Sequence, residues 1–148
     1  MVSIEVLRSL PYFAGVSPDT LRAVAEFTQE REFKAGEALA REGDVARWLC
    51  ILRAGQVDVI YRSQAHGGSI VDTVVPGELL GWSALLPPHK ITATIEGREN
   101  GRYVAIDAEG LRKLCEKDHT LGFGLMTWVA QEIRNRLQGV SVQLATTG

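Results

Sequence analysis

Short apolar runs separated by glycines fill the middle of this chain, roughly residues 28–106, and constrain its fold more than any other feature. In one run, Val57, Val59 and Tyr61 alternate with their neighbours in a mostly period-two pattern, which is typical of a half-buried strand. Glycines lie between the runs, where turns often need a positive φ. They are Gly36, Gly43, Gly55, Gly67, Gly68, Gly77, Gly97 and Gly101. Many short strands with evenly spaced turns predict a β-sandwich or barrel.

Helical patterns flank this β region on both sides. In the first, roughly residues 3–27, Ser17 and Pro18 supply an N-cap and a proline at the first helical position. In the last, roughly residues 107–144, Asp107 is the predicted N-cap. A helix, then many strands, then helices predict an α+β protein built on a β-barrel.

The last helix, from about residue 121 to 144, carries two apolar stripes. One has heptad-type spacing over nearly three heptads and consists of Met126, Ala130, Ile133, Leu137, Val140 and Leu144. The other consists of Leu121, Leu125, Trp128 and Val129. Because this surface is wide for a single contact, we expect one stripe to pack on the β region and the other to form a homodimer. The alternative is a helix packed wholly on its own domain.

Composition limits the class of protein further. The 148 residues suit a single domain, 1–148, and the formal net charge of −2 gives no general basic footprint for nucleic acid. No apolar run is long enough to span a membrane, and the N-terminus lacks the pattern of a signal peptide. Cys50 and Cys115 are too few and too far apart for a disulfide framework or a zinc site, so we expect reduced thiols in a cytoplasmic protein.

The segment from Gly77 to Ile95, GELLGWSALLPPHKITATI, resembles the phosphate-binding cassette of the cyclic-nucleotide-binding domain of bacterial catabolite activators and eukaryotic kinase regulatory subunits. The turn glycines from Phe33 onward fit the same family, and the resemblance covers about residues 5–140. It implies an eight-stranded jelly-roll barrel with an N-terminal helix and C-terminal helices. It also implies a ligand pocket roofed by the cassette, residues 77–94, and capped by the last helix.

The resemblance assigns roles to several cassette residues. Glu78, between Gly77 and Leu79, would accept a hydrogen bond from the ribose 2′-hydroxyl of a nucleotide. Gly77 and Gly81 would let a phosphate approach backbone N–H groups, although both could simply permit tight turns. Thr92 and the backbone N–H of Ala93 would donate to the phosphate.

Ile91 occupies the position of the family's phosphate-binding arginine. A hydrogen bond to a charged group contributes about 1.5–3 kcal/mol, so its loss predicts binding weakened roughly ten- to a hundredfold or more. Lys90 would compensate if the strand that follows starts late or bulges, whereas a surface lysine is the alternative.

No catalytic or metal-binding pattern competes with this interpretation. The three histidines, His66, His89 and His119, are scattered, and no nucleophile elbow or Walker-type loop is present. The sequence therefore predicts a protein that is not an enzyme and needs no cofactor.

The sequence predicts a small-molecule-sensing regulatory domain with weakened or altered nucleotide binding, for which cyclic AMP or cyclic GMP is the candidate effector. The alternative is a degenerate, ligand-free scaffold that serves dimerisation or protein–protein interaction. Family transcription regulators carry a winged helix-turn-helix after the long helix, whereas this chain stops at Gly148, so we expect no DNA binding by this chain alone.

Overall fold

The computed structural model describes residues 1–13, 15–63 and 67–147, and in this part of the chain the strands form two four-stranded sheets. The first sheet has the order β1 (Thr28–Phe33), β8 (Gly101–Asp107), β3 (Trp48–Ala54), β6 (Leu79–Leu80). The second has the order β2 (Ala38–Ala40), β7 (Thr94–Gly97), β4 (Val57–Ser63), β5 (Gly67–Val74). All the pairings that join these neighbours are antiparallel.

The expected closed eight-stranded barrel is wrong, because the strands pair within two separate sheets. Closure would require hydrogen bonds from β1 to β2 and from β5 to β6 at the sheet edges. Strand β2 has only three residues and β6 only two, so neither offers a ladder long enough to bridge the sheets. Very short edge strands are a common way to end a sheet. The fold is therefore an α+β sandwich, with the strand region and the flanking helices where the sequence predicts them.

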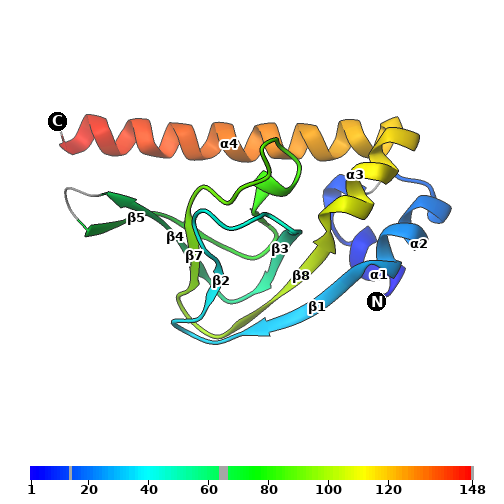
Figure 1. Ribbon diagram of the computed structural model, residues 1–148, viewed down its shortest axis with the longest axis horizontal. Coiled ribbons are helices and arrows are strands. Elements are labelled where there is room, and N and C mark those ends of the chain that lie inside the picture. The colour runs from blue at the N-terminus through cyan, green and yellow to red at the C-terminus, as the bar shows by residue number, and fades with distance from the viewer. Residues whose placement is uncertain (14, 64–66, 148) are drawn as a thin grey trace.

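Helices gather at one end of the sandwich and along one side of it (Figure 1). They are α1 (Ile4–Arg8), a 3₁₀ turn η1 (Pro11–Phe13), α2 (Pro18–Glu26), α3 (Ala108–Lys117) and α4 (His119–Thr147). Both predicted N-caps are confirmed: the Ser17 side chain accepts a hydrogen bond from the Thr20 N–H, and Asp107 accepts one from the Gly110 N–H at 2.9 Å. Among the described residues, none of the helices is long and apolar enough to cross a bilayer.

Two apolar clusters hold these layers together. One lies around the inner faces of both sheets and includes Phe33, Val57, Leu80 and Ala105. The other joins the helices to the first sheet, and in it the rings of Tyr12 and Trp128 stack with centroids 3.8 Å apart. The long helix is thereby fixed to the N-terminal segment as well as to the sheets.

The two stripes of α4 have different environments. The stripe formed by Leu121, Leu125, Trp128 and Val129 is buried, which confirms one half of the prediction. The other stripe is exposed to solvent: 64% of Leu137 is accessible, and Met126 and Ile133 are also exposed. Phe123, 77% accessible, continues it toward the start of the helix. The side chains of Val140 and Leu144 lie outside the described residues, and a second subunit on this stripe stays a prediction.

Candidate ligand-binding site

The cassette turns sharply at Gly81, just after β6. Gly81 has φ 72° and ψ 45°, a left-handed conformation that side chains rarely adopt, and it forms the N-cap of the 3₁₀ turn η2 (Trp82–Ala84). A Cβ here would lie 3.6 Å from the Trp48 carbonyl oxygen, so backbone conformation rather than space requires the glycine. The turn brings Trp82 and Ser83 to a cavity between the cassette, the second sheet and α4.

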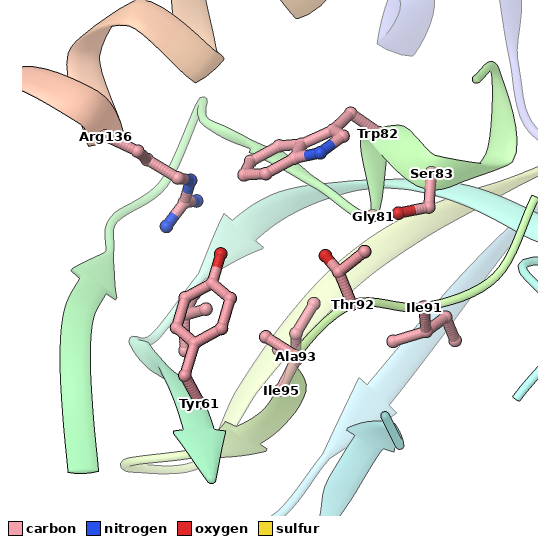
Figure 2. Close-up of a pocket in the computed structure, with 10 residues that line it drawn as sticks. Tyr61, Gly81, Trp82, Ser83, Ile91, Thr92, Ala93, Ile95 and Arg136 are labelled. Atoms are coloured by element: carbon pink, nitrogen blue, oxygen red, sulfur yellow. The ribbon is translucent and has the colours of Figure 1, made fainter. Parts of the chain in front are cut away.

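This cavity is small and is lined by residues from these three parts of the structure. Its lining residues are Val59, Tyr61, Gly81, Trp82, Ser83, Ile91, Thr92, Ala93, Ile95 and Arg136. The Tyr61 and Thr92 hydroxyls point into the space between the Trp82 ring and the Arg136 side chain (Figure 2). Its volume is about 30 Å³, enough for one or two water molecules but not for a nucleotide. The cavity as it stands is therefore smaller than a nucleotide.

Ile91, the predicted position of the family arginine, has an apolar side chain and a backbone held by two hydrogen bonds. The Ile91 N–H donates to the Asp44 carbonyl at 2.8 Å, and the Ile91 carbonyl accepts from the Gly43 N–H at 2.8 Å. The half-buried side chain packs against the helix-side core. Ile91 also borders a second cavity, of about 170 Å³, on its other side. This position supplies no charge to a bound anion.

Arg136 of α4 brings a cation to the cavity, a residue that was not predicted from the sequence. Its side chain is only 11% exposed, and its Nη1 donates to the Asp72 carboxylate of β5 at 3.1 Å. Its guanidinium carbon lies 4.8 Å from the centre of the Trp82 ring, which is a cation–π contact. The helical spacing could have predicted this place for Arg136, because Glu132 and Arg136 continue the buried stripe of Leu125 and Val129.

Glu78 lies away from this cavity. Its carboxylate accepts a hydrogen bond from the Val75 N–H at 2.9 Å, and the neighbouring Gly77 N–H donates to the Leu52 carbonyl at 2.8 Å. These bonds fix the turn that leads into β6. Burial raises the pKa of the Glu132 carboxyl in α4, and the negative charge of Glu78 raises it further. The charge of Glu78 therefore affects α4 through the Glu132 carboxyl.

The structure brings together three of the seven cassette residues predicted to contact a ligand. Gly81, Thr92 and Ala93 line the cavity, whereas Gly77, Glu78, Leu79 and Lys90 do not. Lys90 is exposed, and its backbone forms an isolated bridge with Val45. Strand β7 begins at Thr94, and the late start does not bring Lys90 to the cavity. Among the described residues, no group of three or more His, Cys, Asp or Glu side chains is arranged to hold a metal ion.

The family model of the cyclic nucleotide-binding domain matches residues 30–118, well over half of the chain. The chain belongs to the cyclic nucleotide-binding domain family. The match contains both sheets from Glu30 onward, the cassette and α3.

The curated relatives include an acetyltransferase and a cyclic AMP receptor protein. Acetyltransferase Pat of Mycolicibacterium smegmatis is 37% identical over 95 residues, which are 63% of this chain and 28% of Pat. The cyclic AMP receptor protein of Thermus thermophilus is 22% identical over 86% of this chain and 59% of its own length. This chain thus spans less than two thirds of the length of both curated relatives. A solved structure of a candidate cyclic nucleotide-binding protein from Geobacter metallireducens GS-15 is 32% identical, with a TM-score of 0.81, and the match covers 93% of this chain and 99% of that one.

Proposed function

We propose that this domain is a small-molecule sensor whose nucleotide pocket is weakened or altered, so that cyclic AMP or cyclic GMP binds weakly as an effector. The observation that supports the proposal most is Ile91, an apolar residue that lines the cavity at the position where the resemblance places a phosphate-binding arginine. Without a cation at this position, a cyclic phosphate loses a charge-assisted hydrogen bond.

The small volume of the cavity supports weak binding for a second reason. A nucleotide needs far more space than about 30 Å³, so Trp82 and Arg136 must move before it enters. The free energy of that opening is subtracted from the affinity of the open form. The name of the Thermus thermophilus relative makes cyclic AMP the first ligand to test.

The alternative proposal is a ligand-free scaffold that dimerises through α4. It is supported by the exposed stripe of Phe123, Met126, Ile133 and Leu137, because apolar side chains in a continuous row on a helix favour contact with a partner. A sensor and a dimer are compatible, since the same helix also lines the cavity through Arg136.

Thermal unfolding with added nucleotide distinguishes the sensor from the scaffold. Cyclic AMP and cyclic GMP are each added up to 10 mM, with adenosine, which lacks the phosphate, as the control. A ligand at ten times its dissociation constant stabilises the folded state by about 1.4 kcal/mol, which raises the melting temperature by a few degrees. We expect that increase with at least one cyclic nucleotide and a smaller one with adenosine. No increase with either cyclic nucleotide would reject the sensor and leave the scaffold.

A further inference from the structure

We propose that Arg136 is the phosphate-binding residue of this pocket, and that a nucleotide phosphate takes the place of the Asp72 carboxylate on its guanidinium. This inference rests on the proposed sensor function and deepens it. It assigns the phosphate-binding cation to helix α4 instead of the cassette, where Ile91 lies. In the close-up, Ile91 and Arg136 lie on opposite sides of the pocket (Figure 2).

The Arg136 guanidinium has at least one buried N–H donor without a hydrogen-bond partner among the described residues. Arginine offers five N–H donors in a planar fork that matches phosphate and carboxylate oxygens. Among the described residues, Asp72 receives a bond from Nη1, while the buried Nε has no hydrogen-bond partner. A buried donor without a partner is costly, so an anion that engages Nε as well as Nη1 would be favoured over the single bond to Asp72.

The surroundings of Arg136 suit a phosphate attached to a planar group. The Tyr61 and Thr92 hydroxyls border the same space, and Ser83 contributes a third hydroxyl to the lining. The Trp82 ring lies against the guanidinium and offers a flat apolar face. Asp72 contacts the guanidinium at 3.1 Å but does not itself line the cavity.

Asp72 acts as the competitor of the ligand. Its side chain is 44% exposed at the end of β5, so once released it returns to solvent at little cost. While it holds Arg136, the guanidinium and the Trp82 ring line the pocket and limit its volume. Exchange of the carboxylate for a phosphate would break the link between α4 and β5 and couple the ligand to the helix that carries the exposed apolar stripe. The ligand class is therefore a small nucleotide phosphate, and its binding would alter the position of α4.

Isothermal titration of cyclic AMP into the wild-type chain and three variants tests this assignment. We expect Arg136→Gln to weaken binding at least tenfold and Arg136→Lys, which keeps the charge but loses the fork, to weaken it less. Asp72→Asn, which removes the competing charge, should tighten binding about three- to tenfold. Arg134→Gln is the matched control, because Arg134 is an exposed arginine on the same helix and should leave the affinity unchanged.

The outcomes separate this inference from the sensor proposal. Equal affinity in wild type and Arg136→Gln overturns the role of Arg136 but leaves the sensor intact. An unchanged or weaker affinity in Asp72→Asn overturns the exchange, even where the Arg136 variants fold poorly. Absence of cyclic AMP binding in both wild type and Asp72→Asn rejects the sensor, and with it this assignment.

Discussion

The guanidinium of Arg136 in α4 donates a hydrogen bond to the carboxylate of Asp72 in β5, with Nη1 and Oδ2 3.1 Å apart. The pair joins the second half of the long helix to the edge of the second sheet. The first half is held separately, by the buried side chains of Leu121, Leu125 and Trp128. The two halves of α4 are therefore attached by different kinds of interaction, one apolar and one ionic.

Arg136→Gln should loosen only the second half of α4. A partly exposed ion pair contributes about 0–1 kcal/mol, so amide hydrogen exchange in residues 137–147 should rise up to about fivefold. Amides in residues 121–130 should keep their protection, because the apolar contacts there are unchanged. The measurement is hydrogen exchange by mass spectrometry, with Arg134→Gln as the control. Equal acceleration along the whole helix would contradict the division into two halves.

The buried carboxyl of Glu132 should make stability depend on pH. Burial and the nearby charge of Glu78 raise the pKa of Glu132 in the folded state above its value of about 4.3 in an unfolded chain. The folded state therefore holds the proton more tightly, and this group's contribution to the free energy of unfolding falls as pH rises from about 4.3 through the raised pKa. Below that window the contribution is fully present.

Glu132→Gln removes this dependence, since the amide does not titrate. We expect the difference in free energy of unfolding, variant minus wild type, to increase as pH rises from 4 to 8. The measurement is urea unfolding at several pH values. Glu116→Gln, an exposed glutamate in α3, is the control and should leave the difference near zero at every pH. A constant difference between Glu132→Gln and wild type across this range would show that the carboxyl does not titrate abnormally.

The exposed stripe of α4 predicts a homodimer. Ile133→Glu combined with Leu137→Glu places two charges on that stripe, and light scattering at about 50 µM should then give the mass of a monomer instead of a dimer. Asn135→Glu adds a charge on the same helix outside the heptad spacing, and its mass should equal that of wild type. A wild-type monomer, or a double variant that remains dimeric, would reject this use of the stripe.

Gly101 lies so close to neighbouring strands that a side chain has no room there. A Cβ there would overlap the Ala54 carbonyl oxygen and the Phe33 ring, whereas a Cβ on Gly15 would meet nothing within 4 Å. Overpacking of this kind costs about 1–3 kcal/mol, so Gly101→Ala should lower the melting temperature by several degrees. Gly15→Ala should leave it nearly unchanged. Similar melting temperatures for the two variants would show that the sheet adjusts around the added methyl group.

The fold was largely predictable because its signals are local. Glycines with positive φ at Gly36, Gly43 and Gly55 mark turns, and the caps at Ser17 and Asp107 mark helix starts. What the pattern did not specify was sheet closure. That depends on pairing between distant edges, and the lengths of β2 and β6 are set by tertiary packing rather than by periodicity.

The candidate site was predictable only on its cassette side. Gly81, Thr92 and Ala93 come from one continuous segment, so their spacing carried the information. Arg136 reaches the cavity from a helix far along the chain, and its place follows from how α4 packs. Glu78 belongs to the same segment, but its carboxylate accepts a hydrogen bond from the Val75 N–H instead of lining the cavity. The cassette motif does not specify this hydrogen bond.

Substitution of Ile91 by arginine tests the central claim most directly. Isothermal titration of cyclic AMP into Ile91→Arg should show a dissociation constant roughly ten- to a hundredfold lower than that of wild type, because the new charge-assisted hydrogen bond contributes about 1.5–3 kcal/mol. Lys90→Arg, which places the same arginine on the exposed neighbour, should leave the constant unchanged. A folded Ile91→Arg protein with the same or weaker affinity would contradict the claim that this residue is what weakens the pocket.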